Sequence, residues 1–145
     1  MQFTECTIEL LEEKSYLLAR RITQPTCILL WGAVGAGKTV FARAFIRSYY
    51  ENEALEVVSP TFTIVQTYFG HEECPSKEKL DIWHFDLYRI ENEREVHELD
   101  LREVLDDNIC IIEWPDRLQE ISAQRVVNVY LNVIDEKYRD LAIQL

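Results

Sequence analysis

The sequence predicts an α/β fold with three layers, in which a mainly parallel sheet lies between helices and ends in an antiparallel C-terminal edge hairpin. Short apolar runs of strand length alternate along the chain with segments of helical periodicity, and strands joined through helices are parallel. The C-terminal part instead shows two segments of alternating apolar and polar residues around a turn, which indicates an antiparallel pair. At 145 residues the chain has the length of one domain, so we predict a single domain over residues 1–145.

The N-terminal half predicts a helix, a strand, a loop and a second helix in that order. Apolar side chains recur at helical spacing over residues 7–22, and Pro25 follows that helix. Residues 27–31 form a short apolar run, and residues 38–50 place Phe41 and Phe45 on one side of a helix. Residues 62–69 are rich in β-branched and aromatic residues and predict a strand, and residues 70–79 predict a polar loop.

The C-terminal half predicts two strands that each end in an acidic residue. Residues 80–85 read as a strand that ends at Asp86, and residues 109–112 form a fully apolar strand that ends at Glu113. Between them, residues 93–105 predict one helix. Residues 127–133 and 141–145 alternate around a turn and predict the hairpin at the edge of the sheet.

Composition and charge argue against several classes of protein. No apolar run approaches the roughly 20 residues of a membrane-spanning helix, so we expect no membrane contact. The first residues carry several glutamates and no basic residue, unlike a signal or transit peptide, and we expect a cytosolic protein. The net charge of −11 repels a phosphate backbone, so we do not expect this chain alone to bind nucleic acid tightly.

The cysteines are predicted to be reduced and buried. Cys6, Cys27, Cys74 and Cys110 form no C-x-x-C pair, and two of them lie within apolar runs. Free cysteine in such a run behaves as a small hydrophobic residue. This interpretation is favoured over a zinc site.

Residues 32–39, GAVGAGKT, match the phosphate-loop pattern G-x-x-x-x-G-K-[ST] at every fixed position. The match lies between a predicted strand and a predicted helix, which is the context that this loop requires. Glycines let the backbone N–H groups approach phosphates, and the helix N-terminus adds partial positive charge. We therefore predict a P-loop NTPase-like fold that binds ATP and Mg²⁺ at Gly32, Ala33, Val34, Gly35, Ala36, Gly37, Lys38, Thr39 and Val40. The alternative is an ordinary glycine-rich turn with a surface lysine.

Three side chains are candidates for the chemistry of the site, and we predict Lys38, Asp86 and Glu113 as catalytic residues. Lys38 is expected to reach the β and γ phosphates, and Thr39 to place its hydroxyl on magnesium. Glu113 follows the cleaner apolar strand and is predicted to be a magnesium ligand. Asp86 is predicted to contact either the magnesium ion or the attacking water. The alternative for each acid is a solvated side chain at a strand end.

Two further features admit competing interpretations. His84 is favoured as a strand residue packed beside Trp83, over a catalytic base. Arg43 and Arg47 lie four residues apart and share a face of their helix. A solvated or ion-paired face is favoured there over a surface that docks a partner.

Together with GAGKT, three more strings occur in a fixed order: SPTFT at residues 59–63, HFDLYR at residues 84–89 and IEWP at residues 112–115. With these four strings the chain resembles the TsaE (YjeE) family of bacterial ATPases. The resemblance extends from about residue 7 to the final hairpin. It implies an ATPase that acts with the TsaB and TsaD proteins in making threonylcarbamoyladenosine in tRNA, with tRNA contacted only indirectly through that complex.

The resemblance also implies roles for individual residues. Thr61 and Thr63 match a switch-like segment near the γ-phosphate, and Arg139 matches an arginine on the nucleotide side of the last strands. Trp114 matches a family tryptophan beside the metal ligand. The family often has glycine where Asp100 stands.

Two other functions compete with a conformational ATPase, namely a small-molecule kinase and a non-hydrolytic nucleotide-dependent switch. A kinase usually needs cationic lid residues, and the candidate lid at residues 70–81 contains Lys77 and Lys79 but no arginine. A GTP-dependent switch lacks support because no N-K-x-D string occurs. No arginine is clearly placed to complete the site, so we predict a slow ATPase whose partners change its rate.

Overall fold

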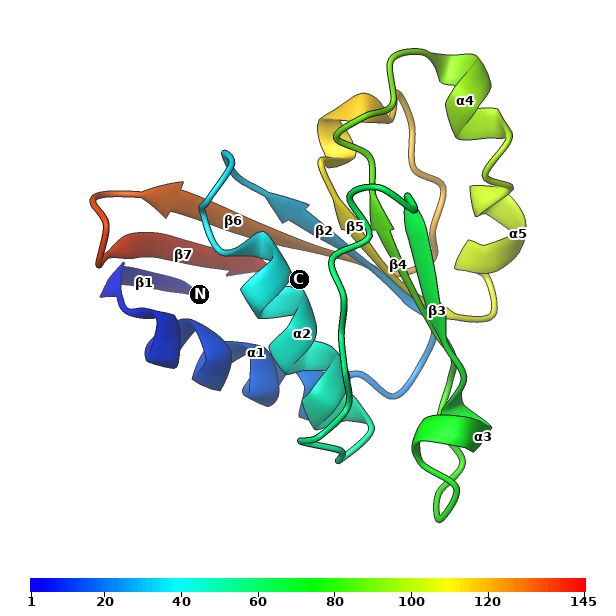
Figure 1. Ribbon diagram of the computed structural model, residues 1–145, viewed down its shortest axis with the longest axis horizontal. Coiled ribbons are helices and arrows are strands. Elements are labelled where there is room, and N and C mark those ends of the chain that lie inside the picture. Colours follow the sequence, from blue (N-terminus) through cyan, green and yellow to red (C-terminus); the bar gives the residue numbers. More distant parts are fainter.

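The computed structural model describes residues 1–145, which form one seven-stranded sheet with helices on both faces (Figure 1). The strands are β1 (Gln2–Cys6), β2 (Thr26–Trp31), β3 (Val65–Tyr68), β4 (Ile82–Asp86), β5 (Ile109–Glu113), β6 (Val126–Val133) and β7 (Arg139–Gln144). The helices are α1 (Ile8–Arg21), α2 (Lys38–Tyr49), α3 (Gly70–Glu73), α4 (Glu93–His97) and α5 (Leu101–Leu105), and η1 (Pro115–Arg117) is a 3₁₀ turn.

The strand order is β1-β7-β6-β2-β5-β4-β3. Strands β6, β2, β5 and β4 run parallel, whereas β1, β7 and β3 each pair in antiparallel fashion with a neighbour. The predicted α/β class, with a parallel centre and an antiparallel C-terminal hairpin, is confirmed. The P-loop follows β2, and both predicted acids end the parallel strands β4 and β5, so all three lie at the carboxyl edge where α/β sheets bind ligands.

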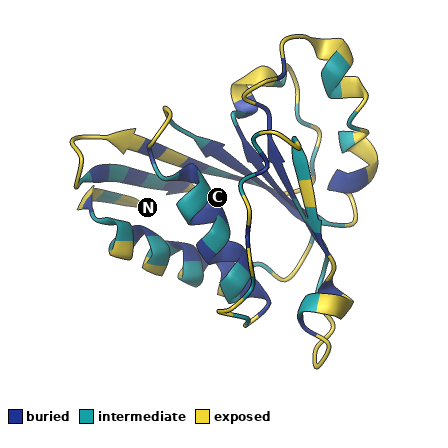
Figure 2. Ribbon diagram, in the orientation of Figure 1, coloured by how far each residue is buried: buried dark blue, intermediate teal, exposed yellow.

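Each face of the sheet buries its own apolar core. Alternate residues of the central strands, such as Ile28 and Ile111, pack with Phe41 and Phe45 beneath α1 and α2. The intervening residues pack with α5 on the other face, and this second core is smaller. Figure 2 shows that burial is concentrated in the central strands and in the inner sides of α1 and α2. The two cores explain why strand β5 is apolar at every position before Glu113.

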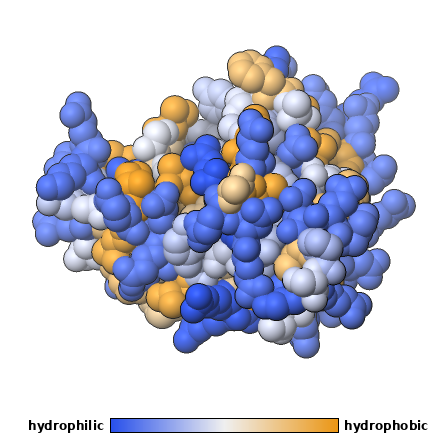
Figure 3. Space-filling model, turned by 60° about the horizontal axis from the view of Figure 1, so that its bottom comes forward, coloured by the Kyte–Doolittle hydropathy of each residue, from blue (hydrophilic) through white to orange (hydrophobic).

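The outside of the molecule is mainly hydrophilic on the side drawn in Figure 3, where hydrophobic residues form only small separate groups.

All four cysteines are buried and free, as predicted. Burial raises the pKa of the Cys27 thiol to about 12. None of the helices is long and apolar enough to cross a membrane.

Several segments of the structure differ from the sequence prediction. Residues 2–6 form β1, which pairs with β7 outside the predicted hairpin, and short polar strands of this kind gain stability only through the pairing. The predicted strand over residues 62–69 begins only at Val65, because residues 61–63 form a turn. The polar segment at residues 70–79 contains the short helix α3.

The predicted helix over residues 93–105 is two helices, α4 and α5, interrupted at Asp100. Asp100 has φ = 52°, in the left-handed region, and its side chain makes no capping hydrogen bond. Glycine adopts this conformation without a steric cost, whereas other residues lose about 1 kcal/mol. Glycine would therefore adopt the backbone angles of Asp100 at a lower cost than aspartate does.

Asp100→Gly is expected to stabilise the protein by about 0.5 kcal/mol, because relief of the left-handed strain exceeds the added entropy of the unfolded chain. Urea unfolding followed by circular dichroism measures the change. Asp106→Gly is the matched control, because Asp106 ends α5 with right-handed angles and its replacement should destabilise. Equal losses of stability in both variants would contradict the argument.

Candidate functional site

The phosphate loop has two positions that only glycine can occupy. Gly37 has φ = 107°, and a Cβ atom there would lie 2.8 Å from Leu11 Cδ2 and 3.1 Å from Arg139 Nη1. A Cβ atom on Gly32 would lie 2.7 Å from the carbonyl oxygen of Leu131. The Leu131 backbone therefore requires glycine at position 32, and the positive φ, together with the close side chains, requires it at position 37.

The loop presents a series of backbone N–H groups that have no acceptor in the protein. The N–H of Ala36 donates to the carbonyl of Ala33 at 3.1 Å and closes the loop. The neighbouring N–H groups that donate to no protein acceptor belong to Gly35, Gly37, Lys38, Thr39 and Val40. Because three of these lie in the first turn of α2, they add to the partial positive charge of the helix N-terminus. The arrangement can bind a phosphate group through the backbone alone.

Lys38 is the cation of this loop, and it is only 6% exposed. Its ammonium group donates to the carbonyls of Gly32 and Ala33 and lies 3.9 Å from the centroid of the Trp114 ring. Burial lowers the pKa of the Lys38 ammonium, and the nearby carboxylates of Glu113 and Asp86 oppose that effect. The positive charge is thus held inside the loop, beside the unpaired N–H groups.

The two predicted acids lie side by side at the ends of neighbouring strands, because Asp86 and Glu113 are register partners on β4 and β5. Glu113 is 2% exposed, and its two carboxylate oxygens accept from two different side chains. Thr39 Oγ1 donates to Oε1 at 2.9 Å, and His84 Nε2 lies 2.8 Å from Oε2. A hydroxyl and a carboxylate placed together at the start of α2 are hard oxygen ligands, which fit Mg²⁺.

Asp86 lies in a second hydrogen-bonded group. Its Oδ2 accepts from Thr61 Oγ1 at 2.9 Å, and its Oδ1 accepts from the N–H of Tyr88 at 3.0 Å. The hydroxyl of Ser59 lies 2.9 Å from that of Thr61. The structure therefore brings the predicted switch threonine, Thr61, to the predicted catalytic acid, while Thr63 is exposed nearby in the sequence.

Arg139 lies beneath the phosphate loop. Its Nη1 donates to the carbonyl of Ala36 at 3.2 Å, and the residue is 5% exposed. The contact is to the loop backbone, and a role of Arg139 toward the nucleotide stays a prediction. Val40 packs its side chain against the core of α1 and α2, so only its backbone N–H faces the loop.

Two other interpretations change with the structure. Arg43 and Arg47 are partly buried and form no ion pair, and their Nε atoms donate to the carbonyls of Val57 at 3.4 Å and Leu55 at 2.8 Å. They hold the segment that leads into Ser59. His84, favoured as a residue merely packed in its strand, is hydrogen-bonded to Glu113; a polar residue inside an otherwise apolar strand was the available indication in the sequence.

The segment considered as a kinase lid lies far from the loop. Residues 70–81 connect the end of β3 to the start of β4, which is the amino edge of the parallel strands. Figure 1 shows α3 at the opposite end of the sheet from the start of α2. The N–H of Gly70 donates to Asp81 at 2.8 Å and fastens this segment in place. Its lysines are therefore not positioned to cover the phosphate loop.

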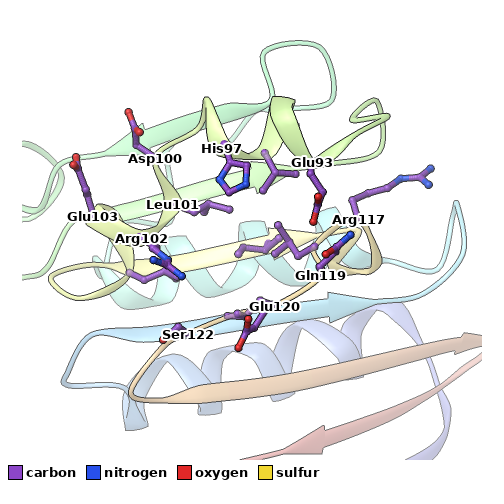
Figure 4. A pocket seen from close by; sticks show the side chains of 15 residues that line it. Glu93, His97, Asp100, Leu101, Arg102, Glu103, Arg117, Gln119, Glu120 and Ser122 are labelled. Carbon is purple, nitrogen blue, oxygen red and sulfur yellow. The ribbon is translucent and has the colours of Figure 1, made fainter.

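A separate cavity of about 440 Å³ lies on the other face of the sheet. Figure 4 shows that its side chains come mainly from α4, α5, η1 and the segment after η1, with charged groups such as Glu93, Arg102 and Arg117 around it. None of the predicted nucleotide-binding residues lines it. The phosphate loop and the two acids therefore form the candidate site, and this cavity is not part of it.

A parallel sheet with G-x-x-x-x-G-K-[ST] between β2 and α2, and acids on neighbouring strand ends, defines a P-loop protein. Residues 7–141 match the family model described as "Threonylcarbamoyl adenosine biosynthesis protein TsaE". The chain belongs to the TsaE family, which confirms the resemblance seen in its four strings. The family's role is in the biosynthesis of threonylcarbamoyladenosine in tRNA.

Individual relatives agree with this assignment. The chain is 35% identical over 123 residues to the tRNA threonylcarbamoyladenosine biosynthesis protein TsaE of Rickettsia felis, covering 85% of this chain and 67% of that protein. It is 31% identical over 136 residues to the protein of the same name in Aquifex aeolicus, covering 91% and 90%. The crystal structure of Bacillus subtilis YdiB shares the fold, with a TM-score of 0.68, 21% identity and coverage of 99% and 83%.

Proposed function

We propose that this protein binds ATP with Mg²⁺ and hydrolyses it to drive the threonylcarbamoyladenosine modification of tRNA. The observation that supports ATP binding best is the series of unpaired N–H groups around the buried ammonium of Lys38. These groups are complementary to a polyphosphate. Because the Lys38 ammonium is buried, its attraction to the negative phosphates would be weakened less by water than at an exposed site. ATP is preferred to GTP because the chain has no N-K-x-D string.

Each residue of the site has a distinct role in this proposal. Lys38 exchanges its loop carbonyls for the β and γ phosphates, and Thr39 and Glu113 hold the magnesium ion. When bound, Mg²⁺ neutralises charge on the phosphate oxygens. Asp86 accepts a hydrogen bond from the attacking water in place of the one that it accepts from Thr61.

The proposed partners are the TsaB and TsaD proteins, and tRNA is reached only through that complex, in the cytoplasm. Phe62 supports a docking surface beside the site, because its side chain is 82% exposed and directly follows Thr61. The guanidinium of Arg89 lies 5.4 Å from the centroid of the Phe62 ring. A change in the contact between Thr61 and Asp86 on nucleotide binding would move Phe62 and signal the nucleotide state to a partner.

The isolated chain is expected to hydrolyse ATP slowly, because the arginine at the loop, Arg139, is buried and donates to the loop backbone. Arg139 is committed beneath the loop, and Arg43 holds the segment before Ser59. An additional arginine can accelerate phosphoryl transfer by roughly a thousandfold or more. We therefore expect turnover well below about 10 per second for the chain alone, and at least about a tenfold change with TsaB and TsaD. Steady-state release of phosphate measures both rates.

Phe62→Ser should remove most of the change caused by the partners and leave the rate of the isolated chain unaltered. Val133→Ser is the matched control, because Val133 is an exposed apolar residue on β6, away from this segment. Rapid hydrolysis by the chain alone, unaffected by TsaB and TsaD, would contradict the proposal. Arg89, whose guanidinium lies over the Phe62 ring, would then be the first arginine to replace by alanine.

A further inference from the structure

His84 is a fully buried polar residue in the middle of β4, with 0% of its surface exposed. Strand alternation places it on the same face as Asp86, and its register partner on β5 is Ile111, two residues before Glu113. The ring Nε2 lies 2.8 Å from Glu113 Oε2, whereas Nδ1 has no hydrogen-bond partner. Its one polar contact is therefore with the carboxylate that the proposed function assigns to magnesium.

The direction of this hydrogen bond follows from the chemistry of the two groups. An ionised carboxylate only accepts, so the imidazole donates its Nε2–H to Glu113. In that neutral tautomer Nδ1 carries no proton, and its lack of an acceptor leaves no buried donor unpaired. His84 thus serves as a fully buried donor of fixed orientation.

Glu113 then receives one donor on each oxygen, from His84 on Oε2 and from Thr39 on Oε1. Because each oxygen has its own donor, the carboxylate is restrained from rotating. The hydroxyl of Thr39 has a single proton, and this proton is directed to Glu113, so the lone pairs of Oγ1 remain available to a metal ion. Rotation of the carboxylate would release the Thr39 hydroxyl from this orientation.

We infer that His84 is a positioning residue that, through Glu113, orients the Thr39 hydroxyl oxygen for Mg²⁺. Its one polar partner is Glu113, so it acts through that carboxylate, as the groups that hydrogen-bond to metal ligands do. This role rests on the proposed function, since it requires the site to bind nucleotide with magnesium. It assigns a function to the histidine of the HFDLYR string that packing beside Trp83 does not supply.

The test compares His84→Met with His84→Gln in the full chain. The two side chains are similar in size, but only glutamine can donate to Glu113 Oε2. A fluorescent ATP analogue is titrated with and without Mg²⁺, and the half-saturating concentration of Mg²⁺ is recorded. His84→Met is expected to raise that concentration about tenfold, to leave magnesium-free binding within about twofold, and His84→Gln to restore most of the loss.

A double-mutant cycle with Glu113→Ala tests whether His84 influences Mg²⁺ binding through Glu113. In the absence of the carboxylate, His84→Met should cause no further change in the half-saturating concentration of Mg²⁺. Additive effects, equal losses with and without Mg²⁺, or a glutamine variant as impaired as the methionine variant would each overturn the inference. Failure of the parent chain to bind the analogue would instead overturn the proposed function itself.

Discussion

Lys38→Ala is expected to lower ATP hydrolysis by about a thousandfold, because it removes the only side-chain cation within the phosphate loop. The ammonium is held among loop carbonyls and against the Trp114 ring, so it is already in place before any phosphate arrives. A preorganised charge of this kind stabilises the developing negative charge without further rearrangement. Phosphate release under saturating ATP, together with equilibrium binding of ATP, measures the loss.

Lys79→Ala is the matched control for this variant. Its ammonium lies 4.6 Å from the centroid of the Tyr49 ring, a contact of the same type, but Lys79 precedes β4 at the amino edge of the parallel strands. It should therefore remove a comparable cation–π contact and leave hydrolysis unchanged. If Lys38→Ala bound and hydrolysed ATP like the parent, the phosphate-loop hypothesis would be wrong.

Glu113→Gln is expected to raise the Mg²⁺ concentration needed for hydrolysis by about a hundredfold and to leave magnesium-free nucleotide binding nearly unchanged. Glutamine has almost the same volume and retains an acceptor oxygen, so the buried site keeps its packing but loses its negative charge. The hydroxyl of Thr39 can rotate to accept from the new amide group, which limits the cost of the change. Hydrolysis rates measured over a series of Mg²⁺ concentrations give the result.

Asp86→Asn provides the comparison at the neighbouring strand end. It should lower the maximal rate without a comparable change in the Mg²⁺ requirement, because Asp86 is bonded to the switch segment rather than to Thr39. A normal Mg²⁺ requirement in Glu113→Gln, with a raised one in Asp86→Asn, would reverse the two assignments. The register of β4 and β5 places the acids side by side, so only such a pair of variants separates them.

Some parts of the structure follow directly from local sequence. The P-loop motif joins a strand to a helix within a few residues, and the central strands are apolar throughout because both faces of a parallel sheet are covered. The carboxyl ends of parallel strands share one edge, so the sequence also placed Asp86 and Glu113 beside the loop. Helix continuity was less predictable, since the periodicity through residues 93–105 does not reveal the left-handed backbone at Asp100.

By itself, the sequence determined the fold class, the phosphate loop and the two acidic strand ends, because each of these depends on a local pattern or on a rule of parallel sheets. The tertiary structure alone decided which side chains meet there. Thr61 reaches Asp86 across 25 residues, His84 reaches Glu113 across 29, and Arg139 reaches Ala36 across 103. Such contacts depend on strand order, register and the path of irregular segments, and no local periodicity in the sequence encodes them.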